Sequence, residues 1–177
     1  LGTPYTSATG DHYLFNTAEN REFVKKFRGW FEKGYVTTQE IFGAYTSGLF
    51  VEQGADKPKS YMSIGSSAGA THQRPTKVNG EYPFEVGIAT VPQEDINNPK
   101  VISQGPSLCI FNGTEQEVLA SWLFVKYLTT NVEFQAEFSM ASGYVPVIES
   151  VKDHPIYSKF LANANGGDNI TALSAKT

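Results

Sequence analysis

The chain has 177 residues, of which 40% are hydrophobic and 18% are charged, so it has enough apolar side chains for the core of a soluble globular domain. Its net charge of −4 and pI of about 5.4 argue against nucleic acid as a partner, because such surfaces depend on clustered lysine and arginine. A single cysteine, Cys109, excludes a disulfide framework and a cysteine-based metal site. We expect Cys109 to be buried in an apolar strand.

The first predicted element is a helix over residues 17–34. Thr17 suits its N-cap and Gly34 suits its end, and the apolar residues between them have the spacing of one buried stripe. The stripe consists of Phe23, Val24, Phe27, Trp30 and Phe31. A less regular helical segment is predicted at 38–51.

Three segments in the middle of the chain are predicted to be strands, at 61–64, 84–91 and 101–112. Each is apolar or alternates between apolar and polar residues, and turn-forming residues flank each one. The dipeptide Asn79-Gly80 predicts a tight turn between the first two strands.

Two helices are predicted after the strands. Thr114 with Glu117, and Thr130 with Glu133, have the spacing of capping boxes. Trp122 lies on the apolar stripe of the first helix, so we assign it to the core.

The sequence after the second of these helices predicts one more short helix. The helix is expected to end at Gly143, and a short helix to begin at Pro155, because proline favours the first turn. From Ala162 onward Asn, Gly, Ala and Ser dominate, so we expect the C-terminus to fray. A helix, three strands and several further helices predict the α/β class.

The sequence Gly-Ser-Ser-Ala-Gly at 65–69 has two functional interpretations beside that of a plain tight turn. It matches the Gly-x-Ser-x-Gly pattern of a hydrolase nucleophile elbow, with Ser67 as the nucleophile. The later histidines suit that role poorly, because His72 is too close in sequence and His154 lies in a polar turn. The other interpretation is a ligand loop, in which small residues let a polyol or an anion approach backbone N–H groups and serine hydroxyls.

Two more turns are candidates for ligand recognition. The turn at 103–107, which contains Gly105, is either a main-chain recognition turn or a bend between strand segments. At Gly143-Tyr144, a glycine that permits a left-handed helix end precedes a ring that either stacks on a sugar or packs internally. Asp153 and His154 do not indicate a metal site, because no third ligand accompanies them.

The order of these segments resembles the second half of the family 1 extracellular solute-binding proteins, the group that contains the maltose- and glycerol-3-phosphate-binding proteins. The resemblance covers about residues 15–160 and rests on the segments 23–30, 60–69, 84–92, 103–111, 117–128 and 143–146. The loop at 65–69 and the Gly-Tyr-Val-Pro turn are most similar to the glycerol-3-phosphate branch. Where the family has Gly-Gly in its interlobe strand, this sequence has Gln104-Gly105.

The resemblance implies an α/β fold of the periplasmic-binding-protein type II, with this chain as the C-terminal portion of a two-lobed protein. Residues 1–100 would form part of the second lobe. Residues 101–150 would form the interlobe strand and helices of the first lobe, and 151–177 would return to the second lobe with a frayed C-terminus. The beginning of the first lobe and the segment that completes the second would be absent.

The resemblance also implies a function, that of the substrate-binding component of an ABC uptake transporter, which is not an enzyme. A carbohydrate or polyol phosphate, such as a sugar or glycerol 3-phosphate, would bind in an interlobe cleft at Ser66, Ser67, Gly105 and Tyr144. Lobe closure would then present the solute to a membrane permease. No cofactor or metal is implied, and the location would be extracytoplasmic, in the periplasm or as a cell-surface lipoprotein. A serine hydrolase that uses Ser67 and a folded but inert single lobe are the alternatives.

Overall fold

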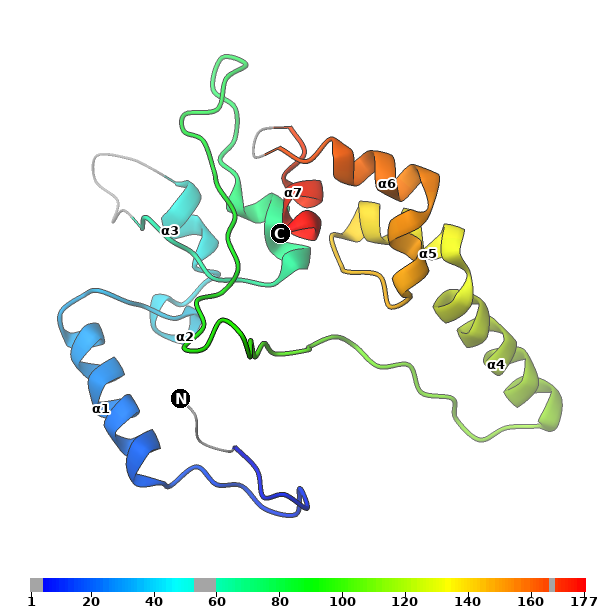
Figure 1. Cartoon of the computed structure of the whole chain (residues 1–177), viewed down its shortest axis with the longest axis horizontal. Coiled ribbons are helices and arrows are strands. Elements are labelled where there is room, and N and C mark those ends of the chain that lie inside the picture. The colour runs from blue at the N-terminus through cyan, green and yellow to red at the C-terminus, as the bar shows by residue number, and fades with distance from the viewer. Residues whose placement is uncertain (1–4, 53–59, 166–167) are drawn as a thin grey trace. The chain divides into compact units, whose positions relative to one another are not determined.

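The computed structural model describes residues 5–52, 60–165 and 168–177. Helices are the main regular elements of these residues, and η1 and η2 are 3₁₀ helices. In chain order (Figure 1) they are α1 Ala18–Glu32, α2 Gln39–Phe42, α3 Ser47–Val51, η1 Ser67–Gln73, α4 Glu115–Thr130, α5 Val132–Ser142, η2 Glu149–Asp153, α6 Pro155–Ala162 and α7 Ile170–Lys176.

The chain divides into two compact units. One comprises Leu1–Gly48 with Gln93–Pro99, and the other comprises Leu49–Pro92 with Lys100–Thr177. The first unit contains α1 and α2, and the second contains η1 and all the helices that follow it.

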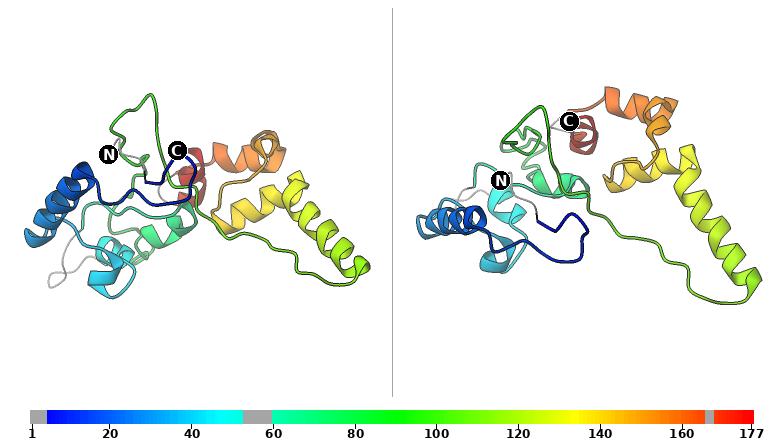
Figure 2. Two further views of the ribbon diagram at one scale, coloured as in Figure 1. Left: turned by 90° about the horizontal axis from the view of Figure 1, so that it is seen from below. Right: turned by 60° about the horizontal axis from the view of Figure 1, so that its bottom comes forward.

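The α/β class predicted from the sequence is wrong for this structure. Within the described residues the only β pairings are two isolated bridges, Thr6 with Tyr13 and Val78 with Glu81. The predicted strands at 61–64, 84–91 and 101–112 form no ladder, although Figure 2 shows the last of them as an extended trace that leads into α4. Apolar patterning favours an extended backbone, but a strand also needs a neighbouring backbone that accepts its hydrogen bonds. The sheet of a type II fold is therefore not present here.

The starts of the long helices follow from the sequence. The Thr17 hydroxyl accepts a hydrogen bond from the Asn20 amide at 3.2 Å and caps α1. A complete capping box opens α4, in which Thr114 and Glu117 each accept a bond from the other's backbone N–H. These two predictions are confirmed.

The second predicted capping box is wrong by one residue. Asn131 is the N-cap of α5, and its side-chain oxygen accepts a 2.8 Å bond from the Phe134 amide. Thr130 is still the last residue of α4, where its hydroxyl donates to the Lys126 carbonyl oxygen. Asn131 has the extended backbone that a cap needs, whereas the bond made by Thr130 is typical of a hydroxyl inside a helix.

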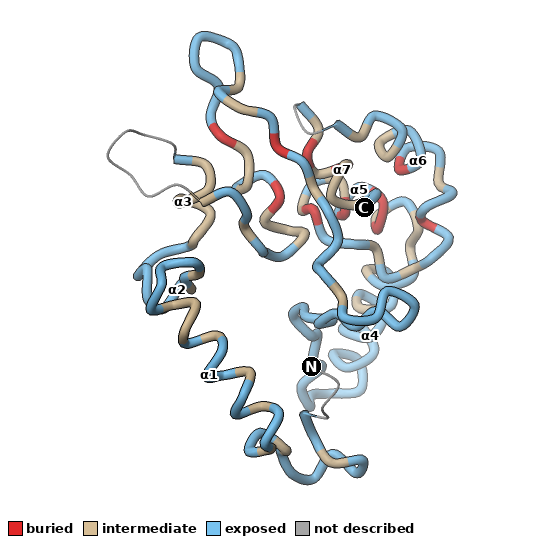
Figure 3. Tube along the Cα trace, turned by 60° about the vertical axis from the view of Figure 1, so that its left-hand side comes forward, coloured by how far each residue is buried: buried red, intermediate tan, exposed pale blue. Residues whose placement is uncertain are grey.

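The core of the second unit lies between α5, η2 and α6. Its buried residues are Ala136, Val151 and Tyr157, and half-buried apolar side chains from the same three elements surround them. Figure 3 shows the buried positions along α5, α6 and α7. Burial of its ring raises the pKa of the Tyr157 hydroxyl. Pro155 begins α6 as predicted.

Three sequence-based assignments to the core are wrong. Helix α4 has no buried residue, and 53% of the Trp122 surface is exposed. The thiol of Cys109 is exposed rather than buried. Helix α1 likewise has no buried residue, and its apolar stripe, with Trp30, is only partly covered. Periodicity identifies the apolar face of each helix, but a residue becomes core only when a second element covers that face.

Candidate functional site

The loop that contains Ser66 and Ser67 turns directly into η1. Ser66 has an extended backbone as the N-cap residue, and its carbonyl oxygen accepts a 2.9 Å hydrogen bond from the Gly69 amide. Ser66 is exposed and Ser67 is half-buried. The two serine hydroxyls therefore lie at a tight bend whose small residues leave the backbone accessible.

Gly143 and Tyr144 form the turn that ends α5. Gly143 has a left-handed backbone with φ of +78°, and its amide donates to the Ser139 carbonyl oxygen at 2.9 Å. The Tyr144 amide donates to the Ser142 hydroxyl at 3.3 Å. Tyr144 is 38% exposed, so solvent reaches it.

These two turns, which lie far apart in the sequence, meet in space. A Cβ atom at Gly143 would lie 3.1 Å from the Ser67 carbonyl oxygen and 3.3 Å from the Ala68 Cα. The structure thus brings the backbone of the turn that contains Tyr144 against the backbone of the loop that contains Ser66 and Ser67.

Two buried polar atoms flank the same loop. The Ser63 hydroxyl oxygen and the Gln73 side-chain carbonyl oxygen are both inaccessible to solvent and without a hydrogen-bond partner. The Gln73 amide nitrogen lies 3.2 Å from the position that a Cβ would take at Gly65, so Gln73 packs over the start of the loop. A buried polar atom without a hydrogen-bond partner lowers the stability of the folded protein by about 1–3 kcal/mol. A ligand that supplies the hydrogen bond would remove this cost.

Gly105, the fourth predicted site residue, is not gathered with the others. It lies in the exposed extended segment at 101–112, and nothing lies within 4 Å of the position that its Cβ would occupy.

The hydrolase interpretation gains little support from the geometry. A 3₁₀ helix does follow Ser67, but among the described residues no hydrogen bond joins Ser67 to a histidine. His72 is exposed, and the buried Nδ1 atom of His154 has no hydrogen-bond partner. A serine nucleophile needs a base within hydrogen-bond reach to remove its proton.

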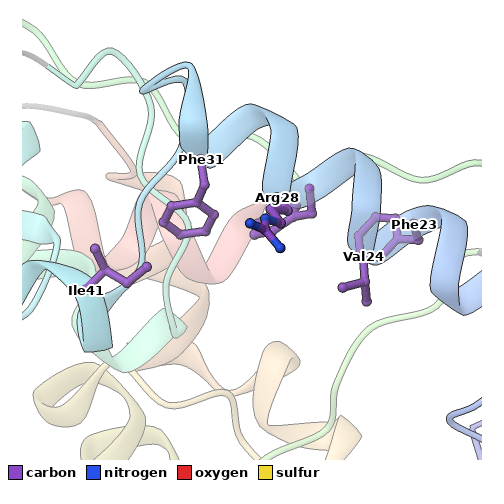
Figure 4. Close-up of a pocket in the computed structure, with 6 residues that line it drawn as sticks. Phe23, Val24, Arg28, Phe31 and Ile41 are labelled. Carbon is purple, nitrogen blue, oxygen red and sulfur yellow. The ribbon is translucent and has the colours of Figure 1, made fainter.

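A hollow lies on α1, apart from the candidate residues, and we call it the α1 groove. It has a volume of about 380 Å³ and is lined by Phe23, Val24, Phe27, Arg28, Phe31 and Ile41 (Figure 4). The Arg28 guanidinium already pairs with Glu32 at 2.8 Å. A groove with almost no polar lining does not provide the hydrogen bonds that select a hydroxyl-rich solute. For that purpose the polar loop at Ser67 is the better site, although it forms no comparable hollow.

Sequence reasoning missed the elements that hold the two turns. The side chain of Gln135 connects the backbone of α4 with that of Val147, just after Tyr144. Thr171 of α7 also contacts the Gly143 position, although fraying was expected beyond Ala162. The Asn169 side chain caps α7 by accepting a bond from the Ala172 amide, a signal that could have been found in the sequence.

No group of three or more potential metal ligands is close together in the described residues. Nor does any described helix combine the length and hydrophobicity needed to cross a membrane. Among curated proteins and among solved structures, no match to the chain was found. Residues 5–165 match the family described as bacterial extracellular solute-binding protein. The chain therefore belongs to this family, whose members act outside the cytoplasm as the solute-binding components of ABC transporters, generally without catalysing a reaction.

Proposed function

We propose that the chain binds a carbohydrate or a polyol phosphate, such as a sugar or glycerol 3-phosphate, and presents it to the permease of an ABC uptake system. The observation that carries this proposal is the contact between the Gly143-Tyr144 turn and the Ser67 loop. The turn and the loop that meet there carry an exposed Ser66, a half-buried Ser67 and a partly exposed Tyr144. Such a set suits a ligand rich in hydroxyl groups, which needs hydrogen bonds and an aromatic surface.

In this proposal Ser66 and Ser67 hydrogen-bond to ligand hydroxyl or phosphate oxygens. Tyr144 stacks on the ligand or donates its phenolic O–H. The unpartnered oxygens of Ser63 and Gln73 add acceptors near the loop, which a small rearrangement would offer to the ligand. Gly105 is included because of the sequence resemblance alone. No bond is made or broken.

Isothermal titration calorimetry with glycerol 3-phosphate and with maltose tests the proposal. We expect at least one of these probes to bind, and Ser67→Ala and Tyr144→Ala each to weaken its affinity by about tenfold, because the first removes a hydrogen bond to the ligand and the second removes both the ring and its O–H. Ser158→Ala and Tyr45→Ala are the controls, since both side chains are exposed and neither residue belongs to the two turns. Equal affinity in all five proteins would show that the site lies elsewhere.

An ester panel separates binding from hydrolysis. We expect no turnover of nitrophenyl esters. Turnover that disappears in Ser67→Ala would establish the nucleophile-elbow interpretation and overturn the proposal.

A further inference from the structure

Helix α7 is firmly docked within the second unit. It packs against η1 and α6, and Ile170 and Ala172 are only 1% and 0% exposed. Just before the helix, Asp168 pairs with Lys77 at 3.0 Å, across a long separation in sequence. The helix lies C-terminal to residues 5–165, which match the family. The match to the family therefore does not include α7.

Gly143 is the point where α7 meets the two turns of the candidate site. Around the position of a Cβ at Gly143 lie the Ser67 carbonyl oxygen at 3.1 Å, the Ala68 Cα at 3.3 Å and the Thr171 Cγ2 at 3.5 Å. The first two atoms belong to the backbone, which cannot rotate aside as a flexible side chain can. A side chain at residue 143 would therefore push the Tyr144 turn away from the Ser67 loop.

We propose that Gly143 and Thr171 are positioning residues, which set the separation between the Ser66–Ser67 loop and Tyr144. Gly143 permits the close approach, and the Thr171 methyl group supports it from the α7 side. The inference rests on the proposed function, because the separation matters only if one ligand touches both turns. Hydrogen bonds weaken steeply as their distances and angles depart from the optimum, so small displacements of one turn lower the affinity.

The chain contains a matched control for Gly143→Ala. Gly43 ends α2 with the same φ of +78°, and nothing lies within 4 Å of its Cβ position. Alanine at either position incurs the same backbone strain, but only at Gly143 does it also meet the neighbouring backbone. A difference between the two variants therefore reports the contact rather than the strain.

The first measurement needs no ligand. In the unchanged protein and in Gly43→Ala, NMR should show a nuclear Overhauser effect between an α-proton of residue 143 and the α-proton of Ala68. In Gly143→Ala the new methyl group takes the place of the α-proton that faces Ala68, and we expect only a weak effect from this methyl group to the Ala68 α-proton, because the turn has moved away. A strong effect from the methyl group, as its 3.3 Å separation from the Ala68 Cα in the unchanged backbone would give, would overturn the proposal, whether or not any solute binds.

The second measurement is calorimetry with whichever of glycerol 3-phosphate and maltose binds. We expect Gly143→Ala to lower the affinity by about tenfold or more, and Gly43→Ala to leave it unchanged. Thr171→Ser, which removes the Cγ2 methyl group, should lower it about threefold, because the turn is held less firmly. Thr171→Val should retain the original affinity, because it keeps that methyl group and loses only the hydroxyl.

Failure of this inference and failure of the proposed function give different results. If the unchanged protein binds neither probe, the proposed function is wrong for these solutes, and the NMR signal still decides the positioning role. If it binds a probe and Gly143→Ala binds equally well, the function stands and the positioning role is wrong. A loss in Thr171→Val with none in Thr171→Ser would also contradict it, because the hydroxyl rather than the methyl group would then be responsible.

Discussion

The side-chain oxygen of Gln135 accepts a hydrogen bond from the backbone amide of Val147 at 3.1 Å. The side-chain amide of the same residue donates to the Leu128 carbonyl oxygen near the end of α4. Gln135 itself is buried, with 8% of its surface exposed, whereas Val147 is exposed. This residue therefore ties the segment after Tyr144 to the junction of α4 and α5.

Replacement of Gln135 by leucine should destabilise the second unit. The change leaves the Val147 N–H and the Leu128 C=O without the Gln135 side chain, and a lost hydrogen bond typically costs about 0.5–1.5 kcal/mol. Urea unfolding followed by circular dichroism measures the loss. Glu137→Leu on the exposed face of α5 is the control, and an equal loss in the control would show that the bridge contributes nothing.

Asp11 should titrate well below a free aspartate. The Ser7 hydroxyl donates to its carboxylate at 2.6 Å and the Thr9 hydroxyl at 2.7 Å, and these bonds lower its pKa from 3.8 to about 2. Because the folded state has the lower pKa, the stabilisation is present above pH 3.8 and is lost as the pH falls through about 2. Carboxyl ¹³C NMR against pH measures the midpoint.

Ser7→Ala should raise the pKa of Asp11 toward its ordinary value, since the Ser7 bond is the largest contribution to the shift. Thr6→Val is the control in the same turn, and it should leave the midpoint in place. An unchanged midpoint in Ser7→Ala would contradict this assignment.

Loss of the Thr114 cap should open the start of α4. In Thr114→Ala the Glu117 amide loses its 3.3 Å bond to the Thr114 hydroxyl, and we expect its hydrogen exchange to accelerate about fivefold. Gln116→Ala, at an exposed position in the same turn, should exchange as the unchanged protein does. Hydrogen exchange of the Glu117 amide at the original rate in Thr114→Ala would mean that the capping box does not stabilise the first turn of α4.

The docking of α7 should depend on Ile170. This side chain is 1% exposed, and truncation of a buried isoleucine to alanine typically costs about 2–5 kcal/mol. Chemical unfolding of Ile170→Ala should show a loss in this range, and the exposed Lys176→Ala on the same helix should show none. If Ile170→Ala unfolds at the original denaturant concentration, α7 does not contribute to the packed unit.

Several elements could be predicted from the sequence because their signals are local. The caps at Thr17 and Thr114, the proline that begins α6 and the glycine that ends α5 act within one or two helical turns. The turn at Asn79-Gly80 was found for the same reason. Both of its residues have positive φ, and the Val78–Glu81 bridge encloses them.

The other features depend on which segments meet. Alternation at 84–91 and 101–112 indicated extended backbone, but a sheet requires partner strands, and none pairs with them among the described residues. The apolar stripe around Trp122 indicated an inward face, but 53% of the Trp122 surface is exposed and α4 has no buried residue.

By itself the sequence determined the caps at Thr17 and Thr114 and the glycine that ends α5, because short-range hydrogen bonds and backbone preferences determine them. Only the tertiary structure decided that the turns at Ser67 and Tyr144 touch at Gly143 and that Gly105 lies apart from them. Contacts between residues distant in sequence depend on the packing of α7 against η1 and α6 and of α5 against η2 and α6, which no local pattern encodes.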